Sequence, residues 1–437
     1  MKKLLTNARI IDPFGESEYI ENGYILIGNE TISEVGTGSA LNFEVDESID
    51  LNGKTVIPGM INAHTHLYSA LALGMPPPVK TPKNFVEKLE EIWWKLDLAL
   101  DEQSTQASFE SGLLECLKCG VTTVFDHHSS PNFTENSLDL LVETAEKFKQ
   151  NMSIAFEITD RNGEQLLKSG LTENIRAFKK YKNNKYVYPL IGLHASFTLS
   201  DQSLQSIYNT FKGYQNWGIH IHVSEDLADE KDAKSKGYNS VIERLHKFKL
   251  LNENSFIIHG IHTSAKDIEL LKKVGPTLVH NPTSNANNRV GILSNKHISR
   301  LNAGLGTDGT RANMLEEATQ GTLIRSSHLT GGAEAINYLE LLFKNNPEIA
   351  TRTFGRKLGH LATGYQADLA IYDYHPRTAI NANNFTGHLL FGLLTPRAVI
   401  TRGEFRIRNN KFINSTEKDI LNNSIVQSKR LWNTILK

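Results

Sequence analysis

Short apolar runs recur between helix-like segments along the middle of the chain, and each run ends in polar or ionisable residues. The eight runs span residues 56–66, 121–128, 152–160, 188–196, 218–225, 256–260, 277–282 and 301–309. An uninterrupted apolar run is typical of a strand buried on both faces of a parallel sheet. Eight such strands alternating with helices predict a (β/α)8 barrel, in which functional residues lie at the carboxyl ends of the strands.

Both ends of the chain have a different pattern. Residues 1–57 contain stretches in which apolar and polar residues alternate, with turn residues at short intervals. Residues 365–374 and 397–412 have the same character, and a polar helix is expected after them. We therefore expect a composite β domain built from residues 1–57 and 362–437, which includes the C-terminal helix, beside a barrel formed by residues 58–361.

A long connection separates the first two predicted strands. Its second half, FVEKLEEIWWKLDLAL, has apolar residues at helical spacing, among them Phe85, Leu89, Trp93 and Leu96. Two interpretations are equally open. This helix is either a lid over the barrel mouth, or a helix packed on the barrel wall or at a subunit contact.

Composition narrows the function classes. The chain has 437 residues, and 47 Lys and Arg against 48 Asp and Glu give a formal net charge of −1, without the basic excess of a nucleic-acid-binding protein. No apolar run approaches the roughly 18 residues of a membrane span, and the N-terminus lacks the apolar run of a signal peptide. Cys116 and Cys119 are the only cysteines, too few for a four-cysteine metal site. We expect them to be structural, and the protein to be cytoplasmic with no membrane or nucleic-acid partner.

The 16 histidines are unusually placed, since several fall at predicted strand ends. His64 and His66 are two residues apart at the end of the first strand, so both side chains point to the same side of an extended chain. His220 and His222 repeat this spacing at the fifth strand. A single pair of this kind is a weak signal, but two pairs in barrel order indicate a metal site.

Three further ionisable residues fall at the same predicted barrel edge. Glu225 follows the fifth strand, His259 ends the sixth, and Asp308 ends the eighth. Imidazole and carboxylate groups together suit zinc, iron and manganese. The sequence therefore predicts a divalent metal at the barrel mouth.

Several segments resemble the signature motifs of the amidohydrolase superfamily. They are PGMINAHTHLYSAL, HVSED, HGIHTS, HNPTSN and LGTDG. The resemblance is to the branch of cytosine deaminases, guanine deaminases and triazine hydrolases. Within it, HTHLYSALALGM, IWWKLDLALDE, FEITDRN and TGHLLFG are similar to the aminohydrolases called SsnA. The resemblance covers nearly the whole chain and implies a distorted (β/α)8 TIM barrel beside a small β-sandwich built from both termini.

The resemblance also implies roles for individual residues. The implied metal ligands are His64, His66, His222 and Asp308. Glu225 matches the proton shuttle of the family, and His259 matches the group that contacts the hydrolytic water or the substrate oxygen. Asp308 also accepts a hydrogen bond from that water, whereas His220 has no ligand role and is expected in the site wall or core. Relatives with two metals use a bridging residue on the fourth strand, often a modified lysine. No lysine is present in YPLIGLHAS, which favours one metal.

Other residues at the strand ends have two interpretations each. His194 matches a substrate-contacting histidine of the family, or is a satisfied core histidine. Asp126 and the Asp160–Arg161 pair contact substrate or form ion pairs at the barrel rim. Ser284 and Asn285 are expected in the site wall, where they brace Asp308.

These expectations together describe a metal-dependent hydrolase of carbon–nitrogen bonds other than peptide bonds. Metal-bound water would attack a ring carbon of a small heterocycle such as a purine, pterin or triazine, and ammonia would leave. One alternative is the loss of chloride or an alkylamine from a similar ring. The other is a non-catalytic barrel that serves in assembly. The resemblance also implies a homodimer or a larger homo-oligomer.

Overall fold

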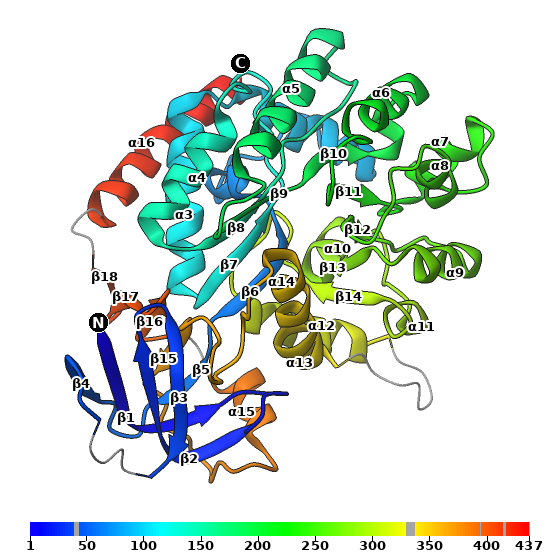
Figure 1. Ribbon diagram of the computed structural model, residues 1–437. Coiled ribbons are helices and arrows are strands. Elements are labelled where there is room, and N and C mark those ends of the chain that lie inside the picture. The colour runs from blue at the N-terminus through cyan, green and yellow to red at the C-terminus, as the bar shows by residue number, and fades with distance from the viewer. Residues whose placement is uncertain (39–42, 329–336, 394, 414–416, 437) are drawn as a thin grey trace.

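The computed structural model describes residues 1–38, 43–328, 337–393, 395–413 and 417–436. Its larger part is a distorted α/β barrel, and a separate β sheet lies at one end of the molecule (Figure 1). Each of the eight predicted strand regions contributes to the barrel, and the fourth region forms two strands, so the described residues form nine barrel strands. The barrel strands are β6 (Met60–Thr65), β7 (Val121–Asp126), β8 (Asn151–Ile154), β9 (Val187–Pro189), β10 (Ile191–Ala195), β11 (Ile219–Val223), β12 (Phe256–His259), β13 (Thr277–His280) and β14 (Asn302–Leu305).

These strands form two parallel sheets, in the orders β6-β7-β8-β9 and β10-β11-β12-β13-β14. The fourth predicted strand is interrupted at Leu190, so that β9 and β10 belong to different sheets. Isolated bridges join the sheets at both seams, Ile158 with Leu193 and Thr65 with Asp308. The cylinder is therefore not continuously hydrogen-bonded, which confirms the distorted barrel.

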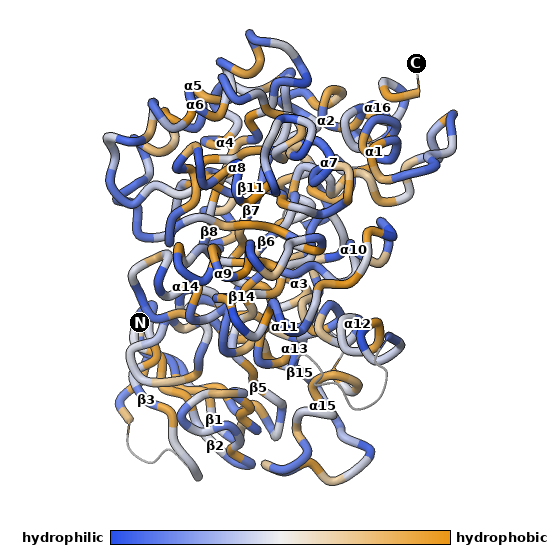
Figure 2. The backbone as a smooth tube through the Cα atoms, turned by 90° about the vertical axis from the view of Figure 1, so that its right-hand side faces the viewer, coloured by the Kyte–Doolittle hydropathy of each residue, from blue (hydrophilic) through white to orange (hydrophobic). Residues whose placement is uncertain are grey.

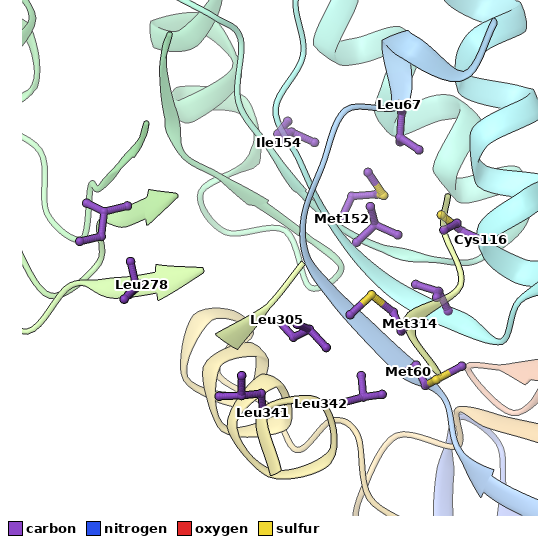
Figure 3. Packing of buried hydrophobic residues seen from close by; sticks show 14 of the residues in the cluster. Met60, Leu67, Cys116, Met152, Ile154, Leu278, Leu305, Met314, Leu341 and Leu342 are labelled. Atoms are coloured by element: carbon purple, nitrogen blue, oxygen red, sulfur yellow. The ribbon is translucent and has the colours of Figure 1, made fainter. Parts of the chain in front are cut away.

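Helices alternate with the barrel strands and pack around them (Figure 1). They are α3 (Glu102–Lys118), α4 (Ser137–Phe148), α5 (Glu164–Tyr181), α6 (Asp201–Phe211), α7 (Leu227–Ser235), α8 (Val241–Lys247), α9 (Ala265–Val274), α10 (Pro282–Asn288), α11 (Asn295–Ile298), α12 (Met314–Ser326), α13 (Tyr338–Glu340) and α14 (Asn346–Phe354). Their apolar faces join the strands in one hydrophobic cluster, part of which Figure 3 shows around Met60, Met152 and Met314. Cys116 is buried in this cluster without a disulfide, as expected of a structural cysteine.

Both ends of the chain contribute to one nine-stranded sheet, in the order β18-β17-β16-β15-β5-β1-β2-β3, with β4 beside β1. Its strands are β1 (Lys2–Ile11), β2 (Tyr19–Gly28), β3 (Thr31–Thr37), β4 (Glu47–Asp50), β5 (Thr55–Pro58), β15 (Leu369–Tyr372), β16 (Ala398–Thr401), β17 (Glu404–Arg408) and β18 (Lys411–Phe412). The antiparallel pairing of β5 with β15 joins the two ends of the chain. The sheet has its own hydrophobic cluster, in which residues of β3 and β17 both take part. The division of the chain at residues 57 and 362 stays a prediction.

The first predicted strand, residues 56–66, is two strands rather than one. β5 belongs to the terminal sheet and β6 to the barrel, with Gly59 between them. A Cβ atom at Gly59 would lie 2.5 Å from Oγ1 of Thr122 and 2.9 Å from Cβ of Asp368. Only glycine therefore fits where the chain passes from one sheet to the other.

The long connection after β6 covers the barrel mouth. It contains a turn at Leu67–Ala72 and a helix made of α1 (Phe85–Lys88), the wider turn Leu89–Trp93 and α2 (Trp94–Ala99). The C-terminal helix α16 (Glu417–Ile435) packs against α2 and α3, so it lies on the barrel and not on the terminal sheet (Figure 2). The indole of Trp432 donates a hydrogen bond to the carbonyl of Leu71, 2.9 Å away. A short helix, α15 (Phe385–Phe391), precedes β16.

Among the described residues, no helix combines the length and apolar character needed to cross a membrane.

Candidate active site

Four of the predicted residues meet at the carboxyl ends of β6, β11 and β14. Nitrogen and oxygen atoms of His64, His66, His222 and Asp308 all lie within 4.8 Å of one another. Nε2 of His66 lies 3.1 Å from Nε2 of His222 and 3.0 Å from Oδ1 of Asp308. Nε2 of His64 lies 3.6 Å from the same carboxylate oxygen. The two-residue spacing of His64 and His66 thus brings both rings to one point, as predicted.

The second ring nitrogens determine the tautomers of these histidines. Nδ1 of His66 donates to the carbonyl of His127, and Nδ1 of His222 donates to the carbonyl of His194, both at 2.7 Å. In the neutral form of each ring, Nε2 is consequently left with a lone pair directed into the cluster. Two lone pairs 3.1 Å apart repel each other unless a proton or a cation lies between them. A shared divalent cation fits this arrangement, since zinc binds imidazole nitrogen at about 2.0–2.1 Å.

His64 is oriented by His220, for which the sequence suggested only a place in the wall or core. Nδ1 of His64 lies 2.9 Å from Nε2 of His220, and both rings are fully buried. Nε2 of His64 has no hydrogen-bond partner among the described residues. A buried nitrogen without a partner is costly, so a ligand role for Nε2 would account for it.

The charge of Asp308 dominates the electrostatics of the cluster. Burial alone would lower the pKa of His66, but the hydrogen bond and charge of Asp308 raise it to about 9. Burial also lowers the pKa of His64, to about 3, so this ring is neutral. The protein without metal therefore holds one proton on His66, whose Nε2 faces Nε2 of His222 and Oδ1 of Asp308. A cation would replace that proton.

A second group of residues adjoins the cluster. Nε2 of His259 lies 3.3 Å from Oε2 of Glu225 and 3.9 Å from Oδ2 of Asp308. Nδ1 of His259 donates to Oδ1 of Asn285 at 2.8 Å, which leaves Nε2 facing Oε2 of Glu225. Burial raises the pKa of Glu225, whose other oxygen accepts a hydrogen bond from Nδ2 of Asn288. The pair can therefore take up and release a proton beside the cluster.

The backbone is strained at three of these strand ends. Ser224, His259 and Asp308 have φ angles of 49°, 74° and 57°, in the left-handed region that few residues other than glycine adopt. Ser224 is held by Asp229, whose Oδ2 accepts its N–H at 2.9 Å, and by a hydrogen bond to Glu230. Such strain gathers at functional sites, where the surrounding structure compensates for it.

The other strand-end predictions divide into two groups. Ser284 donates a hydrogen bond to Asp308, in the bracing position expected for it. Asp126 accepts the N–H of Leu67 at 2.7 Å, and Asp160 accepts from Ser203 at 2.6 Å, so both hold loops. Arg161 forms rim ion pairs rather than facing the metal ligands.

A cavity opens from the cluster towards the helix that covers the barrel mouth. His66, His222, Glu225 and Asp308 line one side, and Phe85, Leu89, Trp93 and Trp94 contribute an apolar side. His194 also lines it. Thr198 donates to the carbonyl of Ala195, so its oxygen accepts Nδ1–H of His194 at 2.9 Å, and Nε2 of His194 remains an acceptor. Burial lowers the pKa of His194 to about 4 and keeps the ring neutral.

Sequence reasoning missed the polar part of this cavity wall. Asp97 and Glu157 line the cavity together with the indole of Trp94. Asp97 lies on the covering helix, four and three residues after Trp93 and Trp94, so it shares their apolar face. A charged residue on the apolar face of a predicted helix is the sequence feature that could have revealed Asp97.

Comparison with known proteins agrees with this geometry. Residues 55–405 match the sequence model described as "Amidohydrolase family". A 5-methylthioadenosine/S-adenosylhomocysteine deaminase from Clostridium tetani is 28% identical over 450 residues, covering 99% of this chain and 100% of that protein. The crystal structure of an adenosine deaminase from Xanthomonas campestris with bound zinc has a TM-score of 0.85 at 17% identity, covering 99% of this chain and 98% of that one. An atrazine chlorohydrolase from Arthrobacter aurescens complexed with zinc has a TM-score of 0.82 at 18% identity, with coverages of 98% and 100%.

Proposed function

This chain belongs to the amidohydrolase family, and we propose that it is a metal-dependent aminohydrolase that removes ammonia from a small nitrogen heterocycle. The observation that carries the proposal is the convergence of the Nε2 atoms of His66 and His222 on Asp308, beside the unpartnered Nε2 of His64. These four residues would hold one divalent cation. Zinc fits the donor set, as do iron and manganese.

A divalent cation in this position would lower the pKa of a bound water towards about 7 and so supply hydroxide at neutral pH. Glu225 is placed to accept the proton of this water and deliver it to a ring nitrogen of the substrate, because its raised pKa favours reversible protonation. Nε2 of His259 lies 3.3 Å from Oε2 of Glu225, where it would face the same water. When it is protonated, His259 stabilises negative charge on the attacking oxygen. Ser284 and Asn285 keep Asp308 and His259 oriented.

The cavity favours a planar aromatic substrate. The rings of Trp94 and His194 pack edge to face, with their centroids 5.9 Å apart. Phe85 and Leu89 add apolar surface to the cavity. Nε2 of His194 would accept a hydrogen bond from a ring N–H or an amino group. The name of the C. tetani relative supports an aminopurine as the first substrate class to examine. Pterins and triazines have the same planar, amino-substituted character.

A screen for ammonia release by zinc-loaded protein tests the proposal. It would include aminopurines, pterins, aminopyrimidines, aminotriazines and guanidines, with chloride and alkylamine release measured in parallel on substituted triazines. We expect ammonia from at least one aminated ring. Release of chloride or an alkylamine alone would replace the deaminase proposal with the alternative leaving group, and no turnover at all would favour the non-catalytic assembly role.

The oligomeric state and the cytoplasmic location stay predictions. Leu421, Ile425 and Val426 on α16 are 46%, 56% and 60% exposed, which supports contact with a second copy. Light scattering of the purified chain would test the homodimer.

A further inference from the structure

A group of buried charges lies in the cavity wall formed by α2 and the segment after β8. Asp97 is 1% exposed and Glu157 is 6% exposed, and both line the cavity. Arg161 forms ion pairs with the two carboxylates, at 2.7 Å in the case of Glu157. Ser129 donates to one or the other from 3.2 Å. Asp97, Glu157 and Arg161 therefore form a charged triad outside the proposed metal site.

Arg161 and Ser129 contact only one oxygen of each carboxylate. Arg161 and Ser129 both approach Oδ2 of Asp97 and both approach Oε1 of Glu157. Oδ1 of Asp97 is buried and has no hydrogen-bond partner among the described residues. The wall thus presents one buried carboxylate oxygen without a partner, and an oxygen in this state is costly unless a ligand supplies one.

The charges of the triad would not balance if both carboxylates were ionised. Two carboxylates face one guanidinium. In the ligand-free protein a proton on Asp97 removes this excess charge, because burial raises the pKa of Asp97 to about 8. A cationic ligand would take the place of that proton.

We propose that Asp97 and Glu157 bind a cationic nitrogen group of the substrate, such as an amidinium, a guanidinium or a protonated amine. The proposal rests on the proposed function, since it assigns the substrate class of the same cavity. Trp94 makes the subsite suitable for a planar group. The guanidinium carbon of Arg161 lies 5.0 Å from the centre of the indole ring, so Arg161 is held on one side of the indole while the ring itself lines the cavity. The cationic group would lie against Asp97 and Glu157, and the carbon that is attacked would lie beside Glu225.

Equilibrium binding of two small probes to the full zinc-loaded chain tests this inference. Benzamidine carries a planar amidinium, and benzamide is its neutral counterpart of nearly the same shape. We expect calorimetry at pH 8 to show benzamidine binding at least tenfold more tightly than benzamide. Glu157→Gln and Asp97→Asn should each bring this ratio close to one, because either change leaves one carboxylate to balance Arg161. Glu164→Gln, at an exposed glutamate paired with Lys168, should keep the wild-type ratio.

Three results would overturn the inference. The first is a ratio close to one in the unchanged protein. The second is an equal loss of affinity for benzamidine and benzamide in Glu157→Gln and Asp97→Asn. That result would mean that the triad only anchors α2 to the barrel. The third is loss of the preference for benzamidine over benzamide in Glu225→Gln but not in Glu157→Gln. That result would place the amidinium at the proposed catalytic carboxylate. Because binding needs no turnover, a failed ammonia screen alone would reject the proposed function and not this subsite.

Discussion

His220 lies behind His64, with Nε2 2.9 Å from its Nδ1, and this contact turns the other nitrogen of His64 towards Asp308. Groups that orient a metal-binding histidine commonly contribute about 10–100-fold to metal affinity. We therefore expect His220→Leu to weaken zinc binding by about that factor in a competition titration. His220→Gln should recover part of the loss, because its amide oxygen can accept the Nδ1–H of His64.

The control is His246→Leu, at an exposed position on α8. Unchanged zinc affinity in His220→Leu would show that His220 only fills space beneath the site.

Removal of metal should lower the stability of the folded chain. A ligand that binds only the folded state at 100 times its Kd stabilises it by about 2.7 kcal/mol. We expect the Tm of zinc-loaded protein to fall after chelation and to recover when zinc is restored. His66→Ala should abolish this zinc-dependent shift, since it removes the nitrogen that faces both His222 and Asp308. A full zinc-dependent shift in His66→Ala would contradict the ligand assignment, and a content of two metals per chain would contradict the single site.

Glu225→Gln should keep zinc and lose turnover. The amide has nearly the shape of the carboxylate but cannot accept and deliver a proton, and a positioned acid–base group contributes typically 10²–10⁴-fold to rate. We expect kcat to fall by about that factor on whichever substrate the ammonia screen identifies, with metal content unchanged. Glu164→Gln serves as the matched control. Activity close to that of the unchanged enzyme would remove Glu225 from the mechanism.

Asp97 should make the stability of the ligand-free protein depend on pH. Burial and the neighbouring Glu157 raise the pKa of Asp97 to about 8 in spite of Arg161, from about 3.8 in the unfolded chain. Above pH 4 the unfolded chain loses this proton while the folded chain keeps it, so stability falls as the pH rises towards 8. Asp97→Asn lacks this titration. We expect the Tm of Asp97→Asn, relative to that of the unchanged protein, to rise between pH 5 and pH 8.

The charged and titratable groups that face Asp97 are Arg161, Glu157 and Tyr68. A relative Tm that stays constant or falls across this range would show that Asp97 is ionised throughout in the folded protein.

Gly306 should be needed for the metal site although it carries no functional group. A Cβ atom there would lie 2.8 Å from both the backbone nitrogen and the backbone oxygen of His64. We expect Gly306→Ala to displace β6 and weaken zinc binding at least tenfold, as measured by competition titration. Gly213→Ala is the matched control, since nothing lies within 4 Å of a Cβ at that exposed position. Equal zinc affinity in the two variants would show that the strands can separate without disturbing His64.

The positions of the strands were readable from the sequence because each barrel strand is buried on both faces. The alternating spacing of His64 and His66 also fixed their common direction. The sequence pattern did not show that Gly59 divides the first apolar run between two sheets, since both halves are equally apolar. Asp97 was missed because its partner Arg161 lies 64 residues away in the chain. That pairing depends on how the covering helix lies over the barrel, which local periodicity does not determine.

The seam between β6 and β14 places the two ends of the barrel segment in direct contact. The N–H of Asp308 donates to the carbonyl of His64 at 3.0 Å, across 244 residues of chain. A ribosome must therefore synthesise almost the entire barrel before these two residues can meet, and the exit tunnel delays the meeting further. The site is consequently assembled late, so a nascent chain that still lacks β14 cannot bind metal with all four residues. Metal binding by all four residues therefore indicates that every barrel strand has been synthesised.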